Sequence, residues 1–226
     1  MAKTRIESLR PRAKPLRYFL GYFALFLGAC LAHIRVYGRH NLPDKGPFII
    51  AINHFSRLDP AFIIYAIRRP VAFLMASDQA VEWFLWWAPW LYGYIPTNRT
   101  RLAPSTIKTA LKVLTQGDIL GIFPEGTSTA DEIRPAKSGA VYLSAITGAK
   151  IVPVSILGLS VAWENWFRGV RPTVTIRIGK PFGPVSLPEN RKEKIKALAD
   201  IGDELMSRIA TLLPKKHRGY LRNKSL

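Results

Sequence analysis

The chain has very little cysteine and few acidic residues, and each scarcity narrows what the protein can be. A single cysteine, Cys30, excludes a disulfide within the chain. Acidic residues number 15 against 33 lysines and arginines, which gives a net charge of +18. A surplus of this size favours polyanionic partners: an anionic bilayer, a phosphorylated substrate or nucleic acid. No internal repeat and no low-complexity linker divides the 226 residues, so we expect one main domain.

The sequence also lacks an apolar run of the length that spans a bilayer easily. Residues 18–32 are apolar and uncharged, and extension to residue 34 gives 17 residues. A helix of that length measures roughly 25 Å, against roughly 30 Å for a hydrocarbon core. We therefore expect a helix that enters one leaflet and anchors the protein there, with a full span as the alternative. The basic flank in residues 1–17 predicts a location on the cytoplasmic face of the membrane in either case.

Aromatic side chains are plentiful and unevenly placed. Residues 82–92 hold four tryptophans, too many for a core helix without partners for their indole N–H groups. This stretch is typical of an interfacial helix in the headgroup region, the alternative being a helix packed inside the domain edge. A second tryptophan-containing segment, residues 163–171, is expected to be a loop.

The distribution of aromatic and basic residues bears on the choice of partner. Nucleic-acid binding needs aromatic and basic residues interleaved on one surface, whereas here the basic residues lie mainly at the termini. We therefore expect membrane lipids as partners and no nucleic acid. A non-catalytic protein that binds anionic lipid or nucleic acid stays as the alternative from outside the enzymes.

Apolar strands and amphipathic helices alternate through the middle of the chain. The buried strands are expected at residues 47–52, 71–76, 120–123, 151–157 and 174–178. Helical patterns cover residues 105–116 and about 189–212. This order predicts an α/β fold with a mainly parallel central sheet flanked by helices. The anchoring segment would be 1–34, the domain 35–213, and 214–226 a loose basic tail.

A histidine follows the strand at 47–52 at a position suited to catalysis. A strand end fixes the backbone rigidly while its side chain stays accessible. His54 can accept a proton at physiological pH, and Asp59 can fix its tautomer if the turn folds that carboxylate back beneath the ring. Such a pair needs no serine or cysteine when the substrate brings its own hydroxyl. The alternative is a loop histidine, with Asp59 as a helix cap ahead of Pro60.

A second polar strand end follows about 70 residues later, where residues 123–127 read F-P-E-G-T. With N-H-x-x-x-x-D at residues 53–59, this block strongly resembles the glycerolipid acyltransferase family. Residues 94–99 match the second block of that family, and residues 151–156 match its Val-Pro-Val strand. Four blocks in this order are a specific signal, whereas either of the first two alone would be weak.

The resemblance implies a membrane-associated O-acyltransferase. Such an enzyme would transfer a fatty acyl group from an acyl thioester to the free hydroxyl of lysophosphatidic acid, giving phosphatidic acid. The family's roles would make His54 the general base and Asp59 the carboxylate that orients it. Acyl-coenzyme A or acyl-carrier protein would be the donor substrate, and no metal or other cofactor is expected.

The resemblance also implies an acceptor site. Arg99 matches the family arginine taken to contact the acceptor phosphate, and Glu125, Gly126 and Thr127 match its acceptor-binding block. Physically, Gly126 lets the backbone approach a ligand closely, and Thr127 can donate to a phosphate oxygen. Glu125 is itself an anion, so we expect it to hold Arg99 or a glycerol hydroxyl.

One residue departs from the family pattern. Ser128 stands where the family usually carries an arginine after Glu-Gly-Thr. Arg134 and Lys137 can supply the missing charge, and Lys137 would lie at a helix N-terminus, where anions are favoured. The acceptor therefore stays open between lysophosphatidic acid and another molecule, such as glycerol 3-phosphate, a lysophospholipid or an aminolipid.

Overall fold

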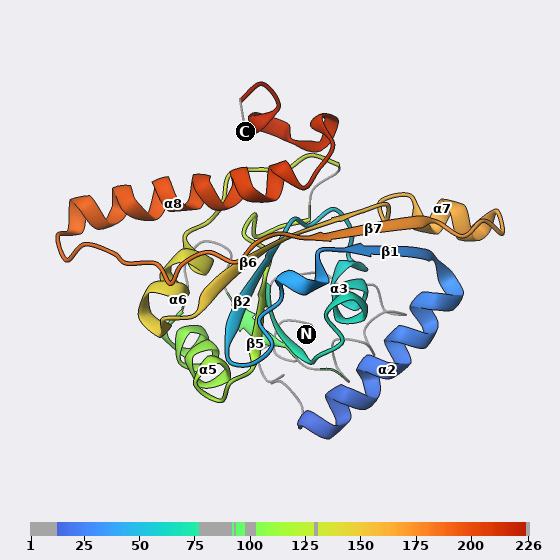
Figure 1. Cartoon of the computed structure of the whole chain (residues 1–226), viewed down its shortest axis with the longest axis horizontal. Coiled ribbons are helices and arrows are strands. Elements are labelled where there is room, and N and C mark those ends of the chain that lie inside the picture. The colour runs from blue at the N-terminus through green and yellow to red at the C-terminus, as the bar shows by residue number, and fades with distance from the viewer. Residues whose placement is uncertain (1–12, 77–91, 93, 98–102, 129–130, 225–226) are drawn as a thin grey trace, which may run out of the picture.

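The computed structural model describes the chain from residue 13 to residue 224 with four internal gaps. The described residues are 13–76, 92, 94–97, 103–128 and 131–224 (Figure 1). Arg99 and the four tryptophans of residues 82–92 lie outside them, so the expectations attached to those residues stay predictions.

Seven strands form one sheet in the described part of the chain, in the order β1-β7-β6-β2-β5-β3-β4. They are β1 His33–Tyr37, β2 Phe48–Ile52, β3 Val71–Ala76, β4 Ile95–Thr97, β5 Ile119–Ile122, β6 Lys150–Leu157 and β7 Thr173–Ile178. Every neighbouring pair is parallel except β6 and β7, which are antiparallel. The expectation of an α/β fold with a mainly parallel sheet is confirmed.

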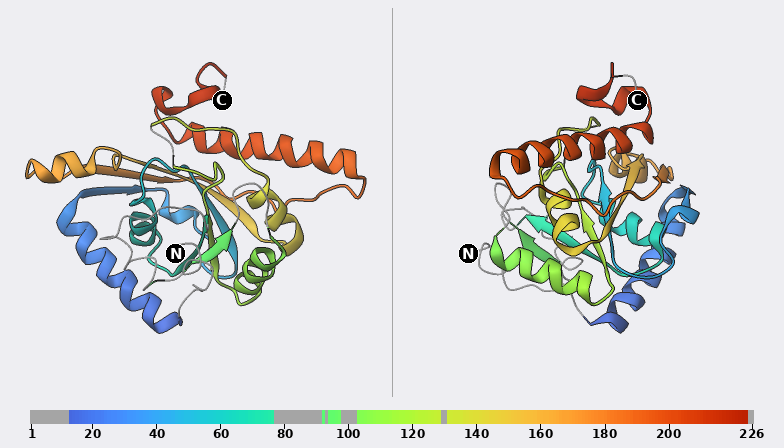
Figure 2. Two further views of the ribbon diagram at one scale, coloured as in Figure 1. Left: turned by 180° about the vertical axis from the view of Figure 1, so that it is seen from behind. Right: turned by 60° about the vertical axis from the view of Figure 1, so that its left-hand side comes forward.

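Helices cover both faces of this sheet (Figures 1 and 2). They are α2 Lys14–Leu31, α3 Asp59–Ile67, α5 Pro104–Thr115, α6 Gly139–Thr147, α7 Ala162–Phe167 and α8 Arg191–Thr211. The apolar sides of α5, α6 and α8 pack with one set of strand residues, and α3 packs with the other set. In β2, Ile49 and Ala51 face the first layer, whereas Phe48, Ile50 and Ile52 face the second.

Strand β2 lies in the middle of the sheet and is covered on both faces. All five of its residues are fully buried, which explains why the sequence reads as an unbroken apolar run rather than an alternating one. Its carboxyl end lies beside the carboxyl ends of its parallel neighbours, β5 and β6. Ligand sites of open α/β sheets lie at this edge, and the polar residues after β2 and β5 therefore meet there.

Two segments differ from the sequence-based expectation. Residues 163–171 are not a loop throughout, because α7 takes up the first part of this segment. The C-terminal tail is not loose: it forms the short 3₁₀ helices η2 Lys215–His217 and η3 Gly219–Leu221. Leu221 is 2% exposed and belongs to the core, so it holds the tail against the domain. The positive charge of this segment had predicted a solvated tail.

Helix α2 lies against α3 and leaves much of its own aromatic surface exposed. Tyr18, Phe19, Tyr22, Phe23 and Phe26 are all between 44% and 68% exposed. The described residues contain no helix that combines the length and the apolarity required to cross a membrane.

Candidate active site

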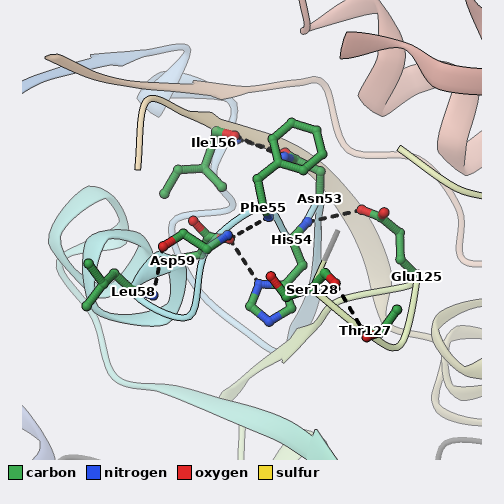
Figure 3. Close-up of polar contacts among 10 residues, drawn as sticks. Asn53, His54, Phe55, Leu58, Asp59, Glu125, Thr127, Ser128 and Ile156 are labelled. Atoms are coloured by element: carbon green, nitrogen blue, oxygen red, sulfur yellow. Dashed lines mark hydrogen bonds and ion pairs between the residues drawn. The ribbon is translucent and has the colours of Figure 1, made fainter. Parts of the chain in front are cut away.

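Asn53 links the end of β2 to β6 through its side chain. The last regular pairing of the two strands joins Ile52 to Val154. One residue later, the Asn53 amide donates to the Ile156 carbonyl oxygen at 2.9 Å and accepts from the Ile156 N–H at 2.8 Å (Figure 3). Because Asn53 is fully buried, these two bonds fix where the strand ends and the turn begins. We did not predict this role from the sequence, although an asparagine directly after an apolar strand is a usable signal.

The turn after Asn53 brings the carboxylate of Asp59 beneath the ring of His54. The Nδ1 atom of His54 lies 2.9 Å from Oδ2 of Asp59 (Figure 3). The same oxygen accepts the backbone N–H groups of Phe55 and Ser56, each at 2.9 Å. The N-cap residue of α3 is Leu58 rather than Asp59. The Asp59 carboxylate accepts from backbone groups of the preceding turn and not from those of the helix. The structure therefore supports the base-and-orienter geometry over the capping alternative.

These contacts decide which nitrogen of His54 carries the proton in the neutral ring. A backbone N–H can only donate, so Oδ2 of Asp59 acts as an acceptor for all three groups. We therefore assign the proton to Nδ1, which leaves the Nε2 lone pair as the basic site. Burial raises the pKa of the Asp59 carboxyl, and the hydrogen bonds from His54, Ser56 and Phe55 oppose that rise.

Phe123, the residue after β5, supports the imidazole from one side. Its ring stacks on that of His54 with centroids 4.1 Å apart and planes 25° apart. The His54 side chain is 16% exposed, whereas Asp59 is 1% exposed. The imidazole of His54 thus has a fixed orientation and access to solvent, while the Asp59 carboxylate is shielded from water.

Glu125 joins the two polar strand ends to each other. Its Oε1 accepts the backbone N–H of His54 at 3.0 Å, and its Oε2 accepts that of Arg134 at 3.2 Å. The carboxylate is 4% exposed, so both bonds lie in a largely dry environment. Glu125 therefore holds the backbone of the turn that carries His54, a role that the sequence did not reveal. Contact with Arg99 or a glycerol hydroxyl stays a prediction.

The remaining predicted acceptor residues gather around Gly126. This glycine has a φ of +70°, and a Cβ there would lie 2.8 Å from Nζ and 2.9 Å from Cδ of Lys137. The side chain of Lys137 therefore passes directly over the Gly126 backbone. Arg134 is exposed and reaches this region through its backbone N–H. The described residues contain no cluster of three or more side chains suited to binding a metal.

Glu125→Gln is expected to weaken the connection between the strand ends. An amide must place its NH₂ group against one of two backbone N–H donors, which leaves a buried donor unpaired. The free energy of unfolding should fall by about 1–3 kcal/mol, and kcat should fall with it. Denaturant unfolding and steady-state kinetics check this, with Glu189→Gln on the exposed surface as the control. Wild-type values for both quantities would show that Glu125 does not hold the turn.

The comparisons with known proteins identify the family. A family model described as Acyltransferase matches residues 33–157. The chain belongs to the acyltransferase family. It is therefore an enzyme, and the matched segment contains both polar strand ends.

Named relatives extend this match beyond the family segment. The chain is 30% identical over 172 residues to a 1-acyl-sn-glycerol-3-phosphate acyltransferase of Bacillus subtilis, covering 74% of this chain and 83% of the relative. A protein of the same name from Borreliella burgdorferi is 28% identical over 183 residues, covering 79% and 72%. The crystal structure of the 1-acyl-sn-glycerophosphate acyltransferase PlsC from Thermotoga maritima has the same fold. Its TM-score is 0.59 at 22% identity, over 92% of this chain and 88% of that one.

Proposed function

We propose that this acyltransferase transfers a fatty acyl group from an acyl thioester to the free hydroxyl of lysophosphatidic acid. The observation that carries the proposal is the 2.9 Å contact between Nδ1 of His54 and Asp59 at the carboxyl end of β2. The names of the relatives point to the same acceptor. The donor would be acyl-coenzyme A or acyl-carrier protein, both of which present the acyl group as a thioester.

The proposed chemistry assigns one proton transfer in each direction to His54. Nε2 takes the proton of the acceptor hydroxyl as its oxygen attacks the thioester carbonyl carbon. The tetrahedral intermediate then expels the thiolate as the new ester forms, and His54 returns the proton to sulfur. Asp59 stabilises the imidazolium between these two steps and keeps the ring in its productive orientation.

The acceptor phosphate would bind near Gly126, where Lys137 and Arg134 supply positive charge. Lys137 lies over the glycine backbone, and Ser128 occupies the position of the usual family arginine. Arg99 remains a further candidate for the same task. The acceptors that compete with lysophosphatidic acid in this proposal are glycerol 3-phosphate, a lysophospholipid and an aminolipid.

Lys137→Met is expected to raise the KM for lysophosphatidic acid roughly 10- to 100-fold, the cost of a lost charged hydrogen bond. The KM for the acyl thioester should change little, because the loss falls on acceptor binding. Lys112→Met, an exposed lysine on α5, is the control of equal charge. A panel of the four acceptors, compared by kcat/KM, tests the assignment itself. A higher kcat/KM for an acceptor without a phosphomonoester would contradict it.

We also propose that the enzyme is bound to the cytoplasmic face of a membrane through α2, as a monotopic anchor. The exposed aromatic side chains of this helix support the proposal. Replacement of Phe19, Tyr22 and Phe26 by serine should lower binding to phospholipid vesicles at least roughly tenfold, since each large apolar side chain contributes about 1.5–3 kcal/mol when buried. Tyr220→Ser, 44% exposed on the C-terminal segment, is the control. Vesicle sedimentation with equal binding of all forms would overturn the role of α2.

A further inference from the structure

A groove lies between α2 and the carboxyl end of α3. It is shallow and open to solvent. Three arginines line it, Arg17 from α2 and Arg68 and Arg69 from the residues after α3, together with Tyr18 and Tyr22. Figure 1 shows α2 lying alongside α3 on one face of the molecule.

Arg17 is the most unusual of these residues because it is charged and 3% exposed. Its Nε and Nη2 atoms are buried, and no group in the described part of the chain accepts a hydrogen bond from either. Its guanidinium lies 5.3 Å from the ring centroid of Tyr92 and is hydrogen-bonded to that side chain, so its contacts there are with an uncharged group. Buried charges are normally paired, because an isolated ion loses its hydration without compensation. A buried guanidinium that lines a groove therefore calls for an anion.

Arg69 shows the same deficit on the other wall of the groove. Its Nη1 donates to the Asp44 backbone carbonyl at 2.8 Å, while its Nη2 is buried and has no acceptor among the described residues. Arg68 is exposed and adjoins it, and burial together with the Arg68 charge lowers the pKa of Arg39 nearby. Positive charges thus crowd this corner of the fold, and the nearest carboxylate effect there is that of Asp118, which acts on Tyr92 rather than on the arginines.

We propose that this groove is a binding site for a phosphate group, held by Arg17, Arg68 and Arg69. The planar guanidinium matches the geometry of phosphate oxygens and can donate two parallel hydrogen bonds to them. The tyrosines at the rim can donate further bonds through their hydroxyl groups. The phosphate comes either from a lipid headgroup, which the neighbouring aromatic face of α2 would bring near, or from a free anion in solution.

The site is separate from the proposed catalytic centre. Helix α3 begins beside His54, and its nine residues carry the chain roughly 13 Å away before Arg68. Neither Arg17 nor the two arginines after α3 contacts the base or the Gly126 region in the described structure. The inference thus goes beyond the proposed reaction and can fail or succeed independently of it.

Thermal unfolding of the full-length protein with and without inorganic phosphate, at constant ionic strength, provides the first test. The Tm of the wild type should rise by roughly 4 °C when phosphate is well above its dissociation constant. Arg17→Met should remove most of this rise while leaving the Tm without phosphate unchanged or higher, because an unpaired buried charge is gone. Arg68→Gln, at an exposed position, gives a second variant whose folding is not at issue. Arg191→Gln, exposed on α8, is the control of equal charge.

Vesicle binding separates the two sources of phosphate. On phosphatidylcholine vesicles containing about one-third phosphatidylglycerol, Arg17→Met and Arg68→Gln should each bind at least roughly fivefold more weakly than Arg191→Gln. A variant effect confined to these vesicles assigns the site to a lipid headgroup, and one seen with inorganic phosphate assigns it to the free anion as well. If wild type, Arg17→Met and Arg68→Gln respond equally to both probes, the proposal is overturned. Transfer to detergent-dispersed acceptor should stay at the wild-type rate in both variants, which keeps this outcome distinct from a failure of the proposed function.

Discussion

His54→Ala is expected to lower kcat by roughly 10²- to 10⁴-fold, the usual contribution of a positioned general base. The Tm should change little, because the two backbone N–H groups that Asp59 accepts remain in place without the ring. Steady-state rates of acyl transfer and thermal unfolding check the two halves of this expectation. His33→Ala, an exposed histidine on β1, is the matched control and should retain the wild-type rate. A His54→Ala enzyme with more than half of that rate would exclude His54 as the base.

Asp59→Asn should reduce kcat by roughly 10²-fold or more, for a different reason. The amide can present its NH₂ group to Nδ1 of His54, which favours the proton on Nε2 and removes the basic lone pair from the substrate side. The defect should persist as the pH rises, because it lies in the tautomer of the His54 ring. A loss of activity caused only by protonation of the ring would be relieved at higher pH.

The profile of kcat/KM against pH separates these outcomes. In the wild type, burial raises the pKa of Asp59, so the ionised carboxylate should be lost on the acid side at a higher pH than for an exposed aspartate. That acid limb should change in Asp59→Asn. Asp200→Asn, exposed on α8, controls for the loss of one negative charge. An Asp59→Asn profile identical in height and shape to the wild type would show that Asp59 does not orient the base.

The strands and the two polar strand ends could be predicted from the sequence because they depend on local patterns. The apolar run before His54 indicates a buried strand whichever strands lie beside it. Asp59 follows His54 by five residues, so a single short turn can bring its carboxylate back to the ring. The pair of hydrogen bonds between Asn53 and the Ile156 backbone could not be predicted in this way, because it depends on which strand lies beside β2. The same holds for Glu125, whose partners are backbone groups 71 and 9 residues away.

Charge was the least reliable guide to local structure. The basic tail predicted a solvated segment, yet the burial of Leu221 and the hydrogen bond from the Ile133 N–H to the His217 carbonyl hold it against the domain. Arg17 belongs to the basic flank that we expected at the membrane surface, but its side chain is buried against Tyr92. In both cases a tertiary contact outweighs the preference of a charged residue for water, and such contacts are invisible to composition.

The central claim is that this enzyme acylates lysophosphatidic acid with His54 as the base. Its most direct test is incubation of the purified full-length protein with lysophosphatidic acid and an acyl thioester that carries an isotopic label in the acyl chain. Mass spectrometry then follows the label. We expect labelled phosphatidic acid, with the new ester on the hydroxyl that was free, to form with the wild type and to form roughly 10²- to 10⁴-fold more slowly with His54→Ala. Absence of phosphatidic acid with the wild type, or equal product from the two proteins, would contradict the claim.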